Sequence, residues 1–358
     1  MRTYMKVLLI ILGIVIVLVL AVIIFVNQPS FGRTPRGERL ERVKASPHYH
    51  DGKFFNEYPT PTQPEDKSFL AAVWEYIITP HPNATPKESV PAIKSNLHAL
   101  SDANQMIWFG HSSYLLKLSG KTILVDPVFY KASFVSFTNP PYAGTDIYRP
   151  EDLPDIDYLV ITHDHWDHLD YQTVMEMKDR IGHIIVPLGV GEHFEYWGFP
   201  KEMVSELDWN EDVVLDLFVF HCLPARHTGG RGLKQDQALW ASFLIETPSM
   251  SVYAGGDSGY DDHFLRIGQH FPNIDLAILE NGQYDRNWGK THCWPEELGQ
   301  AAHDIGAKEI ITVHHSKYTL NAHPWDEPLQ NELTAAKEFN LNLTVLTIGE
   351  VHLFNTKE

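Results

Sequence analysis

The fold of this 358-residue chain is decided by one short stretch, Thr162-His163-Asp164-His165-Trp166-Asp167-His168-Leu169-Asp170. The stretch directly follows an apolar run, residues 158–161, whose length and composition predict a buried β-strand. Three histidines and one aspartate form the pattern H-x-H-x-D-H at the carboxyl end of that strand. Side chains at such a strand end are carried on a loop that a rigid scaffold positions.

The spacing within this motif predicts a metal site. His163 and His165 are two residues apart, so an extended backbone directs both imidazoles to the same side. Asp167 and His168 follow where the chain can curl toward a helix, which adds a second pair of ligands. Imidazole and carboxylate together suit zinc, and they also accept manganese or iron. The alternative is a polar loop in a histidine-rich chain, but four ligands at this spacing after a strand rarely coincide by accident.

Three further candidate ligands share one property with the motif, because each follows an apolar strand. They are His227, Asp257 and His314. Each is weak alone, since a single histidine after a strand is more often hydrogen-bonded at the surface or in the core. The glycines beside Asp257 are also typical of a tight turn. Together the three supply two histidines and a carboxylate, which complete a binuclear site.

Composition limits the classes of partner. Hydrophobic residues make up 44% of the chain, which indicates a globular fold. The formal charge is 28 − 46 = −18, and an excess of carboxylates repels phosphate backbones, so we do not expect nucleic acid as a partner. Cys222 and Cys293 show no zinc-type spacing and no disulfide framework, so buried thiols are expected.

The first 27 residues are predicted to anchor the chain in a membrane. Residues 7–26 carry no charged or strongly polar side chain, and twenty such residues are long enough to cross a bilayer as a helix. The run ends without the small-residue cleavage site of a signal peptide. We therefore expect a single-pass N-terminal anchor. Positive charges flank it on both sides and long domains are translocated regardless of charge, so the sequence leaves the side of the membrane open.

The remaining chain divides into two parts. Residues 28–100 are predicted to form a linker and an N-terminal extension that packs on the domain, because three prolines within residues 56–64 exclude a regular element there. A short helix is expected at residues 69–78. Residues 101–358 form the main domain.

Within the main domain strands come first and then alternate with helices. Ser119-Gly120-Lys121 has the composition of a β-hairpin turn and is expected to join two early strands. Asp126-Pro127 ends the third strand. One strand is expected at residues 213–220, and two closing strands at 343–347 and 350–354. This order indicates two sheets packed face to face with helices outside them.

The order H-x-H-x-D-H, His, Asp, His resembles the metallo-β-lactamase fold hydrolases. The resemblance implies an α/β (α+β) fold, a four-layer αββα sandwich. Within that superfamily the chain is most similar to the branch of N-acyl-phosphatidylethanolamine-hydrolysing phospholipase D and its bacterial relatives. The residues that carry this resemblance are Trp108-Phe109-Gly110-His111-Ser112-Ser113, Asp126-Pro127-Val128-Phe129, Leu169-Asp170-Tyr171, Gly255-Gly256-Asp257-Ser258-Gly259-Tyr260 and His292-Cys293-Trp294-Pro295-Glu296-Glu297.

The resemblance also implies a ligand set. One metal would be held by His163, His165 and His227, and the other by Asp167, His168 and His314, with Asp257 bridging the two. His314 is chosen over its neighbour because it stands where the family's single histidine follows the strand. The phospholipase has a tryptophan where this chain has Thr228, and Trp-Gly where it has His315-Ser316. These departures border the cleft and leave the lipid specificity open.

Two zinc ions in such a site, or manganese or iron, would lower the pKa of a shared water to about 7 and hold it as hydroxide for attack on phosphorus or a carbonyl carbon. Asp167 is expected to bind metal and orient this nucleophile. His292 is the candidate for polarising the substrate or protonating the leaving group, with a surface histidine at a helix start as an equal alternative. His111 is expected beside the ligands rather than among them.

Three residues on the polar loop after the strand at residues 275–279 are expected to line the cleft and contact substrate. They are Tyr284, Arg286 and Trp288.

The sequence therefore predicts a membrane-anchored, zinc-dependent phosphodiesterase that acts on phospholipid-like substrates of the N-acyl-phosphatidylethanolamine type. A lactonase or carboxylic-ester hydrolase on the same binuclear site is the alternative, and a metal-dependent nuclease is the least favoured. The expected partners are a lipid or small-molecule substrate and the membrane. The sequence gives no oligomeric state.

Overall fold

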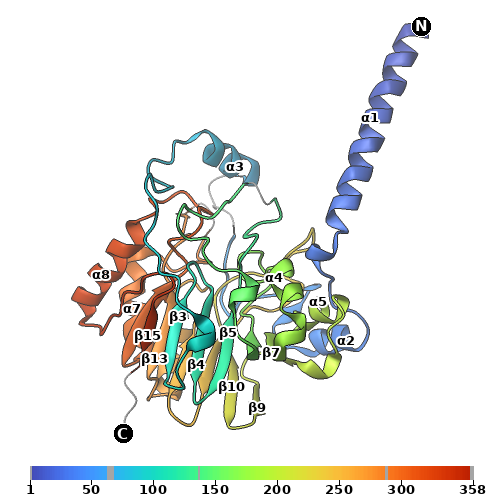
Figure 1. Ribbon diagram of the computed structural model, residues 1–358. Helices are drawn as coiled ribbons and strands as arrows, with labels where there is room; N and C mark the ends of the chain where they lie inside the picture. Colours follow the sequence, from blue (N-terminus) through green and yellow to red (C-terminus); the bar gives the residue numbers. More distant parts are fainter. Residues whose placement is uncertain (1, 63–67, 136–137, 287–288, 355–358) are drawn as a thin grey trace.

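Two β-sheets packed face to face between helices form the main body of the protein (Figure 1). The computed structural model describes residues 2–62, 68–135, 138–286 and 289–354. One sheet has the strand order β15-β3-β4-β5-β6-β7-β8 and the other β14-β13-β12-β11-β10-β9; we call them the N-terminal and the C-terminal sheet. This arrangement confirms the predicted αββα sandwich.

The N-terminal sheet is antiparallel at one side and parallel at the other. Its strands are β3 (Gln105–Trp108), β4 (Tyr114–Leu118), β5 (Lys121–Val125), β6 (Ile156–Val160), β7 (Ile181–Pro187), β8 (Val204–Leu207) and β15 (Val351–Leu353). Strands β5, β6, β7 and β8 pair in parallel. The segments that follow β5 and β6 therefore leave the sheet at the same edge.

The C-terminal sheet contributes a second set of parallel strands. Its strands are β9 (Asp212–Leu215), β10 (Phe218–Leu223), β11 (Ser242–Glu246), β12 (Ser251–Ala254), β13 (Leu276–Glu280) and β14 (Glu309–Val313). Strands β12, β13 and β14 pair in parallel, so the residues after them also come together at one edge.

Successive side chains along a strand belong to different layers of the sandwich. In β6, Val160 belongs to the apolar core between the sheets, whereas Leu159 belongs to the core beneath the outer helices α4 (Tyr171–Glu176) and α5 (Gly191–Tyr196). Successive side chains of a strand point to opposite faces, so a strand apolar on both faces must be covered on both.

The C-terminal sheet is covered in the same way. Helices α6 (His263–His270), α7 (Pro295–Ile305) and α8 (Glu327–Phe339) bury apolar side chains against Leu244 and Tyr253. Both cysteines, Cys222 and Cys293, are buried as free thiols.

The N-terminal helix α1 (Arg2–Val26) projects from the domain (Figure 1). Within residues 3–26 an 18-residue window has a mean hydropathy of 3.8, and no part of this apolar window is buried. Among the described residues it is the helix long and apolar enough to cross a membrane, a test that a signal sequence also passes. The finding therefore indicates an anchor or a signal sequence.

The segment after α1 is more ordered than its composition predicts. It contains the helix α2 (Gly37–Ala45) and a hairpin of β1 (Tyr49–His50) and β2 (Lys53–Phe54). Helix α2 forms because Val43 is buried in the core and Arg39 makes ion pairs with glutamates of the domain. Helix α3 (Phe69–Ile78) lies where it is predicted.

Two strand predictions are wrong. Residues 213–220 form a hairpin of β9 and β10 instead of one strand, since Asp216 takes a positive φ of 54° and reverses the chain. The apolar residues continue through this turn and conceal it in the sequence. Of the two closing strands only β15 forms, and residues 343–347 contribute a single bridge from Leu343 to Ile310.

Burial of a carboxyl group on α8 predicts a pH-dependent stability. Glu332 contacts the hydroxyl of Thr312, and its other oxygen has no hydrogen-bond partner among the described residues. Burial raises the pKa of Glu332 to about 7. Because the folded pKa lies above the unfolded one, the stability from this group is present at acid pH and is lost as the pH rises through about 7.

We expect Glu332→Gln to raise the melting temperature at about pH 8.5 by several degrees, roughly 2–4 °C for each kcal/mol, and to leave it nearly unchanged at about pH 4.5. Thermal unfolding followed by circular dichroism measures both values. The control is Glu338→Gln, an exposed position on the same helix. An equal shift at both pH values would contradict the role of burial.

Candidate metal centre

Side chains from both sheets meet at the edge where the parallel strands end. His163, His165, Asp167 and His168 follow β6, and Asp126 follows β5. From the other sheet, Asp257 follows β12, Glu280 ends β13 and His314 follows β14. Parallel pairing aligns these strand ends, so residues far apart in the sequence lie side by side.

Three histidines form the first group. The Nδ1 atom of His165 lies 3.0 Å from Nε2 of His163 and 3.1 Å from Nε2 of His227. Burial lowers the pKa of His163 and of His227 well below the usual range, so both rings are neutral. His227 donates from Nδ1 to the Thr291 carbonyl at 2.7 Å, which leaves its Nε2 with a lone pair toward the group.

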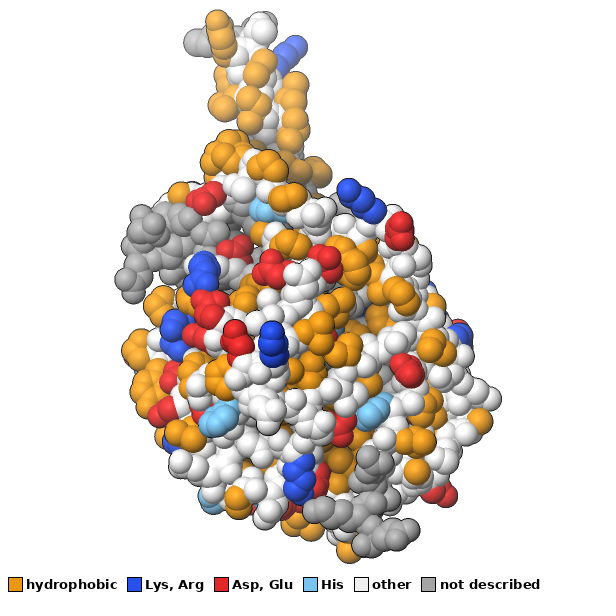
Figure 2. All heavy atoms as spheres, turned by 90° about the vertical axis from the view of Figure 1, so that its left-hand side faces the viewer, with side chains coloured by type: hydrophobic (Ala, Val, Ile, Leu, Met, Phe, Trp, Pro, Cys, Tyr) orange, Lys and Arg blue, Asp and Glu red, His pale blue; other side chains and the backbone are white. Residues whose placement is uncertain are grey.

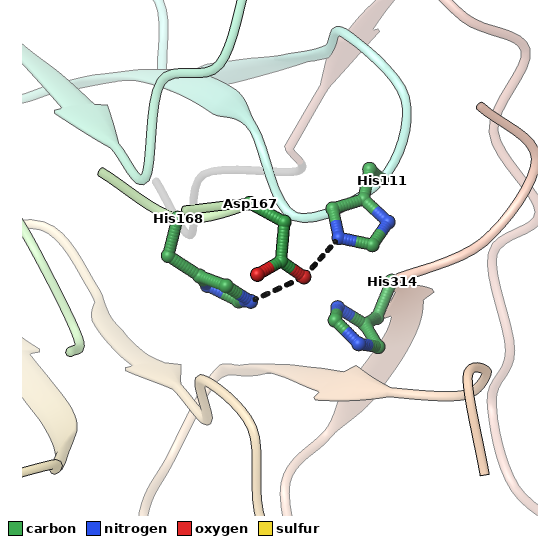
Figure 3. Close-up of side chains that lie close together, drawn as sticks. All are labelled: His111, Asp167, His168 and His314. Carbon is green, nitrogen blue, oxygen red and sulfur yellow. Dashed lines mark hydrogen bonds and ion pairs between the residues drawn. The ribbon is translucent and has the colours of Figure 1, made fainter. Parts of the chain in front are cut away.

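Asp167, His168, His314 and His111 form the second group, and Figure 3 shows the four side chains around one space. One carboxylate oxygen of Asp167 lies 3.6 Å from Nε2 of His168 and 2.9 Å from Nε2 of His111. The ring of His111 therefore contacts the candidate ligand Asp167 and holds its carboxylate in place.

Asp257 lies between the two groups. Its Oδ2 atom is 3.1 Å from Nε2 of His168, 3.7 Å from Nε2 of His227 and 3.9 Å from Nε2 of His163. Its Oδ1 atom is 3.2 Å from Nδ1 of His314. Burial alone opposes ionisation, but the neighbouring histidines outweigh it and hold the pKa of Asp257 well below its usual range. This carboxylate is placed to bridge two cations.

Asp126 positions His168 of the second group through a hydrogen bond to its Nδ1 atom. Its Oδ2 atom accepts from Nδ1 of His168 at 2.8 Å and from the Thr162 hydroxyl at 2.6 Å. Its Oδ1 atom accepts from the Thr162 backbone N–H at 2.8 Å. A carboxylate behind a ligating histidine fixes the orientation of the ring. In the sequence Asp126 marks the end of a strand and belongs to one of the stretches that carry the family resemblance, but the pattern predicts no role for it.

Glu280 is a second residue that the sequence analysis missed. It accepts from Nδ1 of His292 at 2.7 Å and from the Cys293 backbone N–H at 2.6 Å. Burial opposes protonation of His292, but the Glu280 carboxylate outweighs it and raises the pKa of His292 to about 9. Glu280 directly follows an apolar strand, the same signal that selected His227, Asp257 and His314.

The residues present fit metal ions. The buried atoms that have no hydrogen-bond partner in the described part of the chain include four at this centre: Nδ1 of His111, Nε2 of His168, Oδ1 of Asp257 and Nε2 of His314. Buried lone pairs and carboxylates are costly unless a donor or a cation compensates them. Imidazole and carboxylate donors accept zinc, manganese and iron alike. The geometry is therefore that of a metal centre, and it leaves the identity of the metal open.

The centre opens into a cavity of about 640 Å³. Its floor includes His165, Asp167, Asp257, His292 and His314. The apolar part of its wall comprises Ala132, Phe134, Trp166 and Leu320. Polar side chains complete the lining: Ser133, Thr138, Asn139, Gln283, Thr291 and Asn321. The cavity accordingly combines a cluster of metal ligands with an apolar wall.

Two residues expected to line the cleft lie elsewhere. The hydroxyl of Tyr284 donates to Glu327 at 2.7 Å, and Arg286 pairs with Glu296 at the surface. Gln283 has a positive φ of 56°, which turns the chain at this residue. The Gln283 side chain reaches the cavity, whereas those of Tyr284 and Arg286 do not. Trp288 lies outside the described residues.

Comparisons with known proteins agree with this geometry. The sequence profile of the β-lactamase superfamily domain matches residues 121–315. The chain belongs to this superfamily. An uncharacterized protein of Mycobacterium tuberculosis is 36% identical over 313 residues, which cover 85% of this chain and 84% of the relative.

Two further similarities bear on activity and fold. The N-acyl-phosphatidylethanolamine-hydrolyzing phospholipase D 1 of Caenorhabditis elegans is 32% identical over 227 residues, which cover 60% of this chain and 64% of that protein. A metallo hydrolase from Ignicoccus hospitalis shares the fold, with a TM-score of 0.54 and 18% identity over 71% of this chain and all of that one. The protein is thus a metal-dependent hydrolase of the metallo-β-lactamase superfamily.

The position of Asp126 predicts its effect on metal binding. Asp126→Asn keeps the shape of the side chain but removes the charge that orients His168, so metal affinity should fall by about 10–100-fold. Competition with a chromogenic chelator measures this change. The control is Asp179→Asn, an exposed aspartate after α4. A wild-type metal affinity in Asp126→Asn would show that His168 does not need the Asp126 carboxylate to orient it.

Proposed function

We propose that the protein is a zinc-dependent phosphodiesterase that hydrolyses phospholipid-like substrates of the N-acyl-phosphatidylethanolamine type. The observation that carries the proposal is the cavity itself, in which two groups of candidate ligands around Asp257 lie beneath an apolar wall. Similarity to a phospholipase that is named for this substrate supports the same class.

The ligands are assigned as the family order implies. His163, His165 and His227 would hold one metal, and Asp167, His168 and His314 would hold the other. Asp257 would serve both, which agrees with its distances to both groups. Metals bound here would activate water and neutralise charge on the group under attack.

Asp167 orients the attacking water in this proposal. It lies on the cavity floor, and its contact with His111 fixes one carboxylate oxygen. The carboxylate can then accept a hydrogen bond from the water as it approaches the phosphorus atom. Because the Asp167 side chain is mostly buried, at 14% exposed, this interaction acts in a medium less polar than bulk water, where electrostatic effects are larger.

His292 supplies the proton in this proposal. Its Nδ1 is bound to Glu280, so Nε2 is the atom left for a substrate in the cavity. The raised pKa of about 9 keeps the ring protonated near neutral pH. An imidazolium at this position polarises a phosphoryl oxygen or protonates the leaving alcohol.

The apolar wall suits an acyl chain. Phe134, Trp166 and Leu320 offer hydrocarbon and aromatic surface next to the reactive floor. Helix α1 would keep the enzyme at the bilayer that contains its substrate, which is the proposed location of the protein. The charges that flank α1 leave the side of the membrane open.

Product analysis tests the activity. The full chain, purified in detergent with zinc, should release phosphatidic acid from mixed micelles that contain N-acyl-phosphatidylethanolamine, and mass spectrometry detects it. Asp167→Asn serves as the blank and should be inactive. Protein that binds two metals yet releases no phosphatidic acid would contradict the phosphodiesterase, and activity on lactones or small esters would then identify the alternative hydrolase.

Replacement of His292 tests the proton donor. His292→Ala should lower kcat by about 10²–10⁴-fold, the usual contribution of general acid–base catalysis, while metal content stays at the wild-type value. The matched control is His303→Ala, because that histidine is exposed on α7. Wild-type kcat in His292→Ala would limit His292 to a structural role.

A further inference from the structure

Four large apolar side chains are exposed on α3 and on the loops after β5 and β10, and one of them, Phe134, lines the cavity. Trp74 and Ile78 on α3 are 63% and 57% exposed, Phe134 after β5 is 55% exposed, and Leu233 after β10 is 82% exposed. We call these four residues the apolar rim. Isolated exposed apolar residues are ordinary on protein surfaces, whereas apolar residues gathered on one face mark an interaction site.

The apolar rim lies at the end of the domain from which α1 projects. Figure 1 shows α3 and the loop after β5 on that side. In Figure 2 apolar side chains gather beneath the projecting helix, and apolar, acidic and basic side chains are mixed over the face below. Leu233 lines a hollow together with Val26 and Phe31, so it adjoins the last turn of α1.

A row of aromatic rings joins α1 to the cavity wall. Phe25 at the end of α1 contacts Phe31 with ring centroids 5.3 Å apart, and Phe31 contacts Trp166 at 4.9 Å. Trp166 lies 6.4 Å from Phe134. Both Trp166 and Phe134 line the cavity. Apolar surface is therefore continuous from a helix of bilayer-spanning length to the reactive site.

The segment after α1 fixes the domain against the helix. Trp197 donates to the Pro29 carbonyl at 2.7 Å, and Arg231 donates to the Ser30 carbonyl at 3.0 Å. Arg33 and Arg39 pair with the buried carboxylate of Glu192 at 2.7 and 2.8 Å. These contacts leave little freedom for the domain to turn away from the surface that α1 enters.

We propose that the apolar rim inserts into the surface of the lipid bilayer that α1 crosses, so that the cavity opens at the boundary between headgroups and acyl chains. The proposal rests on the membrane location given above. A helix of 25 residues is about 37 Å long and exceeds the roughly 30 Å hydrocarbon core, so its last turn lies at the level where the rim would dock. A lipid could then enter the cavity without crossing water.

The charges beside the rim favour a membrane surface. Lys131 and Lys234 are exposed; Lys131 stands three residues before Phe134 in the chain, and Lys234 directly follows Leu233. A lysine beside an apolar tip can place its ammonium among lipid headgroups while its stem lies along acyl chains. The chain as a whole is acidic, with a formal charge of −18, so these two lysines run against the overall balance.

Site-specific quenching in the full chain tests the proposal. Trp74→Cys, Phe134→Cys and Leu233→Cys are labelled with an environment-sensitive fluorophore, since the native cysteines are buried. Each protein is placed in vesicles of phosphatidylcholine and phosphatidylglycerol, with or without nitroxide-labelled lipid. The control is Leu217→Cys, which is 75% exposed in the turn between β9 and β10, at the edge of the sheet opposite the metal centre.

We expect nitroxide near the headgroups to quench the three rim labels about twofold or more and to leave the label at position 217 unquenched. A label at Ile16→Cys, in the middle of α1, is tested with nitroxide placed on the lipid acyl chains near the bilayer centre and reports on the anchor separately. A quenched anchor label with unquenched rim labels would overturn the docking proposal and leave the anchor intact. An unquenched anchor label would overturn the membrane location on which the proposal rests.

Two other outcomes are distinguished by the same samples. Changes in the rim labels that depend on protein concentration but not on lipid would assign the rim to contact between copies of the chain, which contradicts the proposal. Release of phosphatidic acid is measured independently in detergent, so a failure of the proposed activity would not be confused with a failure to dock.

Discussion

The buried carboxylate of Asp126 is the contact on which the metal centre depends. It accepts from His168, from the Thr162 hydroxyl and from the Thr162 backbone, and it thereby joins the end of β5 to the loop that carries the motif. A charge in this position is stable only because every bond it makes is satisfied within the protein. The orientation of His168, and through it the contact with Asp257, follows from this carboxylate.

The same loop is supported from its other side by residues far away in the sequence. Arg231 donates to the carbonyls of Asp164 and Leu169, at either end of the motif, and also to Ser30. His193 lies 3.0 Å from the Asp164 carboxylate and accepts from the Arg33 backbone N–H. The segment that follows α1 is therefore part of the support for the ligands, and the helix and the site have a defined relation to each other.

Substrate choice depends on the cavity wall rather than on the ligands. The candidate ligands stand at strand ends that the fold fixes, whereas the wall combines the loops after β5, β6, β13 and β14. Gln283 holds two of these loops together, because its amide accepts from the backbones of Leu320 and Asn321 and donates to the Tyr318 carbonyl. His315, which departs from the phospholipase pattern, faces Trp108 and Ser316 rather than the cavity.

The sequence by itself determined the strands, the layering and the candidate ligands. Apolar runs with period two fix which faces are buried, and ligands placed directly after such runs must emerge at one edge of a parallel sheet. The hairpin at Asp216 was missed because apolar residues continue through the turn, and α2 because contacts with distant glutamates stabilise it.

Only the tertiary structure decided what surrounds the ligands. Asp126, Glu280 and Arg231 act through partners that are 12 to 201 residues away, and no local pattern encodes such pairs. The cavity wall is also decided at this level, because a single positive φ at Gln283 determines which side chains of its loop reach the site. Local sequence specifies which groups are available, and long-range packing specifies which of them meet.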